Sequence, residues 1–228
     1  MDNFSFENHI TKQFDEELEE IRSQLLEMGG LVEEQLRMAI RSIEDADSGV
    51  AETVIRQETL VDGMERSIDE ACTLIIARRQ PAASDLRLIV SVGRAVSDLE
   101  RIGDEAKKIA QLAITLTEEG KSPRGYTEVR HIGQCVTQIL HSALDAFARF
   151  DATAALETLQ LDDQIDQDYK TAVRELVTYM MEDPRSISRV INILWVIRAL
   201  ERIGDHSKNL CEQIVFVVQG RDIRHGQL

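Results

Sequence analysis

Cysteine is scarce in this 228-residue chain, and the three cysteines form no recognisable motif. The number of cysteines is odd, and no C-x-x-C spacing occurs among Cys72, Cys135 and Cys211. Both facts argue against a disulfide framework and against a cysteine zinc site. We therefore expect small, buried, apolar cysteines in a protein of the reducing cytoplasm.

Long apolar runs and an excess of basic residues are also missing. No run approaches the roughly 20 apolar residues that span a bilayer, and the first residues lack the basic region and apolar core of a signal peptide. Lysine and arginine number 26 against 41 acidic residues, giving a formal net charge of −15. Because phosphates and anionic lipids repel such a surface, binding to nucleic acid or to a membrane is not expected. The charge favours cations or a basic protein surface as partners.

Proline occurs only at positions 81, 123 and 184, each time at a break in the apolar pattern. Between these breaks, apolar residues recur at steps of three and four, which is the period of an α-helix. No stretch alternates at period two for long enough to predict a strand. The sequence therefore predicts an all-α fold of six long antiparallel helices, at about 7–46, 48–79, 83–118, 126–150, 152–181 and 186–219.

A six-residue segment, Leu-Glu-Arg-Ile-Gly-Asp, occurs at 99–104 and again at 200–205. The duplication extends along the chain, because Asp47 and Asp151 occupy matching turns 104 residues apart, where each suits the N-cap of a helix. The chain is thus predicted to be two tandem three-helix bundles. We place the first at 1–119, a linker at 120–125, the second at 126–220 and a tail at 221–228.

Each copy of the segment carries two carboxylates four residues apart, on one face of a helix and away from its apolar stripe. Such like charges destabilise a helix by roughly 0.2–0.5 kcal/mol, so their duplication suggests a cation between them. The preceding helix carries a second acidic pair in each repeat. If the two faces meet, four oxygen donors converge, which suits magnesium, manganese or iron. The predicted metal ligands are Glu58, Asp62, Glu100 and Asp104 in the first repeat and Asp162, Asp166, Glu201 and Asp205 in the second.

Two alternatives compete with this metal site. Asp104 and Lys107 are spaced i, i+3, so the acidic face can instead be a solvated, salt-bridged surface. Glu128 and His131 match the Glu-x-x-His of di-iron bundles, but the motif lies at a helix start and has no second copy. A carboxylate-bundle enzyme of the di-iron type therefore has weak support.

Two further residues stand near the acidic pairs or the apolar stripe. His206 follows Asp205 and could lend a nitrogen ligand, although we expect an exposed side chain. Trp195 lies beside core positions of the last helix, and we expect it to be a packing residue.

Two sequence segments together carry a resemblance to a known family. They are the duplicated Leu-Glu-Arg-Ile-Gly-Asp and the stretch Arg-Gln-Pro-Ala-Ala-Ser-Asp-Leu-Arg at 79–87. The chain resembles, through nearly all of residues 4–224, the PhoU family of accessory proteins of bacterial phosphate-specific transport. The resemblance implies two similar three-helix bundles. It also implies a negative regulator of the phosphate regulon and of phosphate uptake rather than an enzyme.

The resemblance further implies partners and a cofactor. Family members couple the Pst phosphate ABC transporter, through its ATPase, to the sensor kinase PhoR, and their paired acidic motifs bind multinuclear iron or zinc clusters. The eight carboxylates above match those motifs. Asp85 and Arg87 match the family's Asp-Leu-Arg, whereas the second repeat has Ser188 and Arg189 there. We also expect a homodimer, since exposed helix faces can pair isologously. A purely structural helical module is the remaining alternative.

Overall fold

The computed structural model describes residues 12–120 and 126–223, apart from the side chains of residues 162–164. Within these residues there are seven α-helices, one short 3-10 helix and no strand, so the all-α prediction is confirmed. No helix of this described part is long and apolar enough to cross a bilayer. The helices are α1 Lys12–Glu44, α2 Ser48–Arg79, α3 Ala83–Glu118, α4 Tyr126–Arg149, α5 Ala152–Leu159, α6 Asp162–Glu182 and α7 Ile187–Gln219, with the 3-10 helix η1 at Pro184–Ser186.

The predicted single helix at 152–181 is wrong, because the structure has α5 and α6 there, separated by Gln160 and Leu161. The backbone amides of these two residues bond to the carbonyls of Glu157 and Thr158 at 3.2 and 3.1 Å, three residues back instead of four. This tightening ends α5. The acidic sequence that follows favours a new helix start, since negative charge stabilises a helix N-terminus. The predicted first helix at 7–46 is α1 from Lys12, and residues 7–11 lie outside the described residues.

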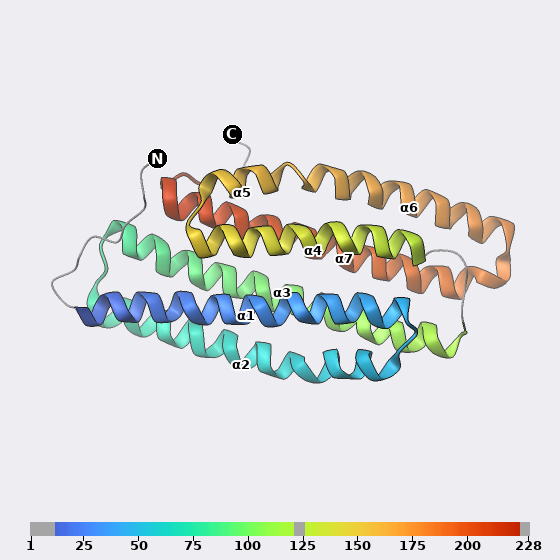
Figure 1. Ribbon diagram of the computed structural model, residues 1–228, viewed down its shortest axis with the longest axis horizontal. Helices are drawn as coiled ribbons and strands as arrows, with labels where there is room; N and C mark the ends of the chain where they lie inside the picture. Colours follow the sequence, from blue (N-terminus) through green and yellow to red (C-terminus); the bar gives the residue numbers. More distant parts are fainter. Residues whose placement is uncertain (1–11, 121–125, 224–228) are drawn as a thin grey trace.

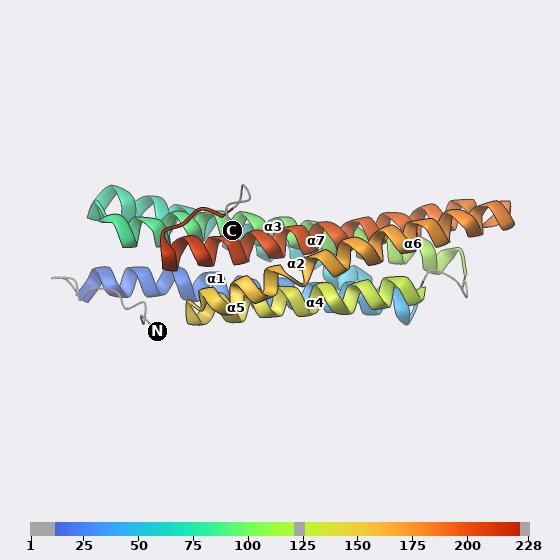
Figure 2. The same ribbon diagram turned by 90° about the horizontal axis from the view of Figure 1, so that it is seen from above.

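The long helices run side by side along the length of the molecule (Figure 1). α1, α2 and α3 form one bundle, and α4, α5, α6 and α7 form the other. The two bundles meet where α1 packs against α4 and α3 packs against α7, the most extensive helix pairing in the molecule (Figure 2). One continuous cluster of buried apolar side chains connects both bundles.

Glycines bring α1 and α4 unusually close. A Cβ added to Gly29 would overlap Cδ2 of Leu144, and a Cβ added to Gly133 would lie 2.9 Å from Cδ1 of Ile40. Gly29 and Gly133 are 104 residues apart, as are Ile40 and Leu144. The same glycine–aliphatic contact therefore occurs twice with the helices exchanged, as expected for two repeats related by an approximate two-fold axis.

The turns into α2 and α5 confirm the predicted N-caps. Oδ1 of Asp47 accepts hydrogen bonds from the amides of Gly49 and Val50 at 2.9 and 3.1 Å. Asp151 makes the same pair of bonds to the first turn of α5, both at 3.0 Å. The residue before each cap has a left-handed backbone, with φ of 55° at Ala46 and 50° at Phe150. The two turns therefore share one geometry.

Candidate metal centre

The first-repeat acidic site lies between α2 and α3, which pack against each other. Burial raises the pKa of Glu100, and the nearby negative charges of Asp104, Glu65 and Asp62 raise it further. The neighbouring Arg101 acts in the opposite direction. Of the other predicted ligands, Asp62 and Asp104 are therefore near enough to repel the charge of Glu100, although the ligand atoms of the three do not all lie within 4.8 Å of one another.

The fourth predicted ligand, Glu58, is held by a cation of the chain itself. Nζ of Lys107 on α3 donates to Oε2 of Glu58 on α2, and this bond raises the pKa of Lys107. The negative charges of Asp104 and Asp62 raise it further. The salt-bridged alternative thus describes one end of the acidic face, where an ammonium group already compensates the carboxylates.

Sequence reasoning missed two carboxylates at the other end of this face. Burial raises the pKa of Glu65, as do the charges of Asp69 and Asp62, and burial also raises the pKa of Asp69. Positions 58, 62, 65 and 69 step by four, three and four, so they share one side of α2. Continuing along the same helix face by a step of three and then a step of four from Asp62 would have found both residues.

The second-repeat acidic site lies between α6 and α7. Burial and the charges of Asp205 and Asp166 raise the pKa of Glu201 against the opposing effect of Arg198. Nη1 of Arg198 donates to Oε1 of Glu201 at 2.6 Å, while Oε2 is buried without a hydrogen-bond partner among the described residues. Asp166 and Asp205 are therefore near enough to Glu201 to influence its charge, but the ligand atoms of the three carboxylates do not all lie within 4.8 Å of one another. The side chain of the remaining predicted ligand, Asp162, lies outside the described part.

The two acidic sites differ in composition. At the positions of Glu65 and Asp69, the second repeat has Tyr169 and Val173. Arg198 in the second repeat matches Ser97 in the first, 101 residues earlier. Its guanidinium lies 5.9 Å from the centre of the Tyr169 ring. The second site therefore has fewer carboxylates and an internal cation.

The donors of the first site fit a hard or borderline cation. Asp62, Glu65, Asp69, Glu100 and Asp104 supply only oxygen atoms, the ligands that magnesium, manganese and iron prefer. They come from two adjacent helices on a partly buried surface, where mutual repulsion is stronger than in water. A cation placed among them would relieve this repulsion.

Two expectations about nearby residues are wrong. His206 is buried rather than exposed: its Nδ1 lies 2.9 Å from Oδ1 of Asp98, which also accepts a bond from Asn209 at 3.0 Å. Trp195 is 60% exposed rather than packed in the core, and it lines a groove of about 470 Å³ between α3 and α7 together with Leu112.

The cysteine prediction is confirmed in part. Cys72 and Cys211 are buried and Cys135 is half-buried, and all three thiols are free.

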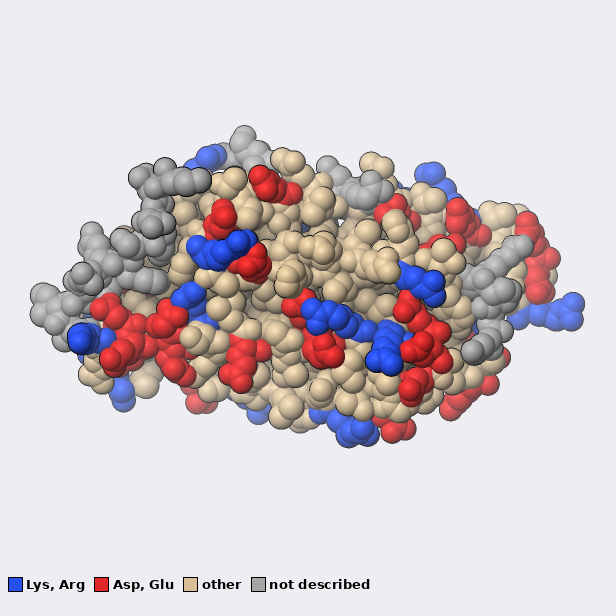
Figure 3. Space-filling view, viewed as in Figure 1, with Lys and Arg blue, Asp and Glu red and all other residues tan. Residues whose placement is uncertain are grey.

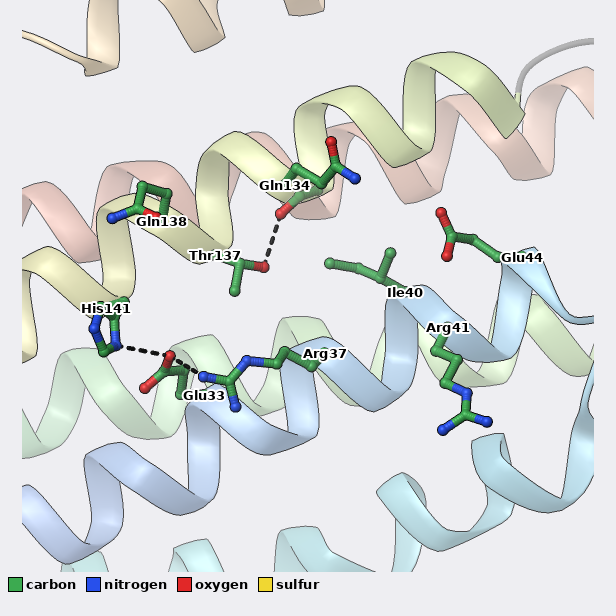
Figure 4. A pocket seen from close by; sticks show the side chains of 10 residues that line it. Glu33, Arg37, Ile40, Arg41, Glu44, Gln134, Thr137, Gln138 and His141 are labelled. Atoms are coloured by element: carbon green, nitrogen blue, oxygen red, sulfur yellow. Dashed lines mark hydrogen bonds and ion pairs between the residues drawn. The ribbon is translucent and has the colours of Figure 1, made fainter.

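Figure 4 shows a second groove, of about 540 Å³, between α1 and α4. Its most buried charged group is Glu33, which accepts from Arg37 and lies 3.1 Å from Nδ1 of His141. Figure 3 shows the charges of this side of the molecule, where basic and acidic side chains lie next to each other over the middle of α1. Arg37 and His141 therefore both contact the carboxylate of Glu33, and the contact with His141 joins α1 to α4 across the junction of the two bundles.

The comparisons with known proteins agree on one family. Its sequence profile, described as the PhoU domain, matches residues 25–113 and 129–214. The phosphate-specific transport system accessory protein PhoU homolog of Pseudomonas aeruginosa is 60% identical over 221 residues, covering 97% of this chain and 91% of that protein. The phosphate-specific transport system accessory protein PhoU of Escherichia coli is 45% identical over 225 residues, covering 99% and 93%.

Two solved structures share the fold. The crystal structure of PhoU from Pseudomonas aeruginosa superposes with a TM-score of 0.90 at 60% identity, covering 92% of this chain and 100% of that one. The phosphate transport system regulatory protein PhoU from Streptococcus pneumoniae gives 0.85 at 31% identity, covering 92% and 99%.

Proposed function

The chain belongs to the PhoU family, whose members are accessory proteins of phosphate transport, and from that membership we propose that it is a negative regulator of phosphate uptake and of the phosphate regulon. It acts through protein contacts in the cytoplasm, as a metal-binding adaptor between the ATPase of the Pst transporter and the sensor kinase PhoR. The similarity to curated accessory proteins along nearly the full chain carries this proposal.

The metal part of the proposal rests on the acidic face between α2 and α3. Asp62, Glu65, Asp69, Glu100 and Asp104 would hold the ion or ions, which can be iron, zinc, manganese or magnesium. A bound cation would supply positive charge and link α2 to α3. The protein's own residues set the selectivity, because oxygen donors suit hard or borderline cations.

A di-iron enzyme is the less favoured alternative. Such a site needs a Glu-x-x-His motif in each half of the bundle, and this chain has one. The relatives are named as accessory or regulatory proteins of transport, and their names indicate no catalytic activity.

Co-purification tests the adaptor role. We expect the full chain to retain both the transporter ATPase and PhoR when phosphate is plentiful. Because the chain is strongly acidic, we expect binding to these partners to weaken as the salt concentration rises. If neither protein binds at any phosphate concentration, the adaptor role is wrong.

Elemental analysis of the purified chain tests the metal role separately. The double change Glu100→Gln and Asp104→Asn is expected to lower the bound metal, because it removes two charged oxygen donors while keeping side-chain size. Glu105→Gln is the matched control, since Glu105 lies on the same helix but pairs with Lys108 and Arg202 at 3.0 and 3.2 Å. If the unaltered chain, the double variant and Glu105→Gln bind equal amounts of metal, the acidic face is a salt-bridged surface and the metal role is wrong.

Self-association belongs to the same proposal. We expect a homodimer formed by exposed helix faces, and sedimentation of the purified chain across a concentration series tests it. A sedimentation coefficient that stays at the monomer value would contradict it.

A further inference from the structure

Three side chains with metal-binding chemistry converge in the second bundle, away from the repeated acidic pairs. His131 and Cys135 are one turn apart on α4, and Asp168 faces them from α6. One ligand atom from each lies within 4.8 Å of the other two. Nε2 of His131 is 3.1 Å from Oδ2 of Asp168. The group thus contains one nitrogen, one sulfur and one oxygen donor from two helices.

This group belongs to the second repeat alone. At the spacing of 104 residues, the matching positions of the first repeat hold Glu27, Leu31 and Met64, which cannot supply the same nitrogen and sulfur donors. The group is therefore not a copy of a duplicated site.

We propose that His131, Cys135 and Asp168 form a binding site for a divalent zinc-like ion. Zinc binds to imidazole nitrogen at about 2.0 Å and to thiolate sulfur at about 2.3 Å, so neighbouring ligands of a tetrahedral ion are separated by about 3.3–3.8 Å. The longest separation in the group need shorten by only about 1 Å, which rotation of side chains can provide. Three protein ligands leave the fourth position open to water or to another carboxylate.

Glu128 is the nearest carboxylate in sequence that can serve as this fourth ligand. It precedes His131 by three residues on α4, and i, i+3 neighbours share a helix face. Its Oε2 is buried and has no hydrogen-bond partner among the described residues. The Glu-x-x-His motif therefore gains a role in a site containing sulfur rather than in a di-iron site.

Because this site contains a sulfur donor, it should select different ions from those that the acidic faces select. Thiolate ligands favour zinc and related soft or borderline ions, whereas groups of carboxylates suit hard ones. Burial and the charge of Asp168 raise the pKa of the Cys135 thiol, so binding must displace a proton from it. An ion held by α4 and α6 would fix α6 to the bundle just beyond the break at 160–161.

Cobalt binding to the purified full chain tests this site, because a thiolate bound to Co²⁺ gives a charge-transfer absorption that oxygen ligands do not give. We expect one equivalent of Co²⁺ to produce the band and Zn²⁺ to remove it by displacement. Cys135→Ser should abolish the band. His131→Asn and Asp168→Asn should weaken binding at least about tenfold, the loss that even an outer-shell partner causes.

Controls separate this result from the proposed regulatory metal. His141→Asn, on the same helix, and Cys211→Ala should keep the band. The Glu100→Gln and Asp104→Asn double variant should also keep it while losing metal from the acidic face. Absence of the band in the unaltered chain, or its survival in Cys135→Ser, would overturn the proposal.

A second measurement needs no variant and therefore no assumption about folding. Zn²⁺ should slow alkylation of the half-buried Cys135 thiol in the unaltered chain, measured by mass spectrometry of peptides, and a chelator should restore the rate. An alkylation rate at Cys135 that does not change with Zn²⁺ would overturn the proposal as well.

Discussion

Replacing Glu100 by glutamine should make the metal-free protein more stable, although it removes a predicted metal ligand. The carboxylate of Glu100 has three nearby negative charges, those of Asp104, Glu65 and Asp62, and one opposing charge, that of Arg101. Each like-charged neighbour on a helix costs roughly 0.2–0.5 kcal/mol. After allowance for the arginine, we expect Glu100→Gln to raise the free energy of unfolding by about 0.5–1 kcal/mol at pH 7.

The gain should depend on pH with a definite sign. Because the pKa of Glu100 is raised above its ordinary value of 4.5 in the folded state, the folded state binds more protons than the unfolded state as pH increases from that value. The unaltered protein therefore loses stability as pH rises through this interval, and the glutamine variant does not. The difference between their free energies of unfolding should shrink toward zero near pH 4. It should reach its full size once the pH exceeds the pKa of Glu100 in the folded state.

Urea denaturation with a chelator present measures both free energies of unfolding. The matched change Glu105→Gln should act in the opposite direction and cost about 1–3 kcal/mol, because it removes the charge that Lys108 and Arg202 share. The reasoning is refuted if Glu100→Gln lowers the free energy of unfolding at pH 7. It is also refuted if the variant gains as much stability at pH 4 as at pH 7.

Three further changes test the packing of the repeats. Ala46→Gly should raise the free energy of unfolding by about 0.5–1 kcal/mol, because glycine adopts the positive φ of that turn without strain; a lower urea midpoint would contradict this. Asp47→Ala should cost about 1 kcal/mol in the same assay, since the first amides of α2 lose their acceptor. Asp98→Ala should cost about 1–3 kcal/mol by removing the acceptor shared by the buried His206 and the half-buried Asn209, and a double-mutant cycle with His206→Ala should show coupling above about 0.5 kcal/mol.

Much of the fold follows from local pattern. The period of three and four in the apolar residues predicted the helices, and Asp47 and Asp151 predicted the turns, because a cap is a contact within four residues. The break between α5 and α6 was not predicted, since Leu161 and Ile165 continue the spacing of an apolar helix face. Backbone geometry, rather than the apolar pattern, ends α5.

Errors occurred where burial depends on the other bundle. Helix periodicity shows which residues share a face, but it does not show what covers that face. His206 is buried because α3 of the first repeat presents Asp98 to it. Trp195 is exposed, and the matching position of the first repeat is the charged Arg94. Comparison of the repeats would therefore have given the better prediction for the tryptophan.

The acidic sites show the same limit. The i, i+4 pairs indicated an acidic face between adjacent helices of one repeat, but they did not include Glu65 and Asp69. The convergence of His131, Cys135 and Asp168 requires the register between α4 and α6, which the sequence pattern leaves open. The contact between Lys107 and Glu58 likewise depends on how α3 lies against α2, whereas the sequence spacing placed Lys107 beside Asp104 on its own helix.

The break at Gln160 and Leu161 should give α6 a faster exchange of its backbone amides with solvent than its counterpart in the first repeat. α2 is one uninterrupted helix of 32 residues, whereas the 21-residue α6 buries only Ile165, Ala172 and Leu176 among its described apolar side chains. Because few of its apolar side chains are buried and a helix break precedes it, we expect α6 to open locally at a lower free-energy cost than α2. Its backbone amides should therefore exchange with deuterium before those of α2, as expected for a cooperative unit that opens on its own.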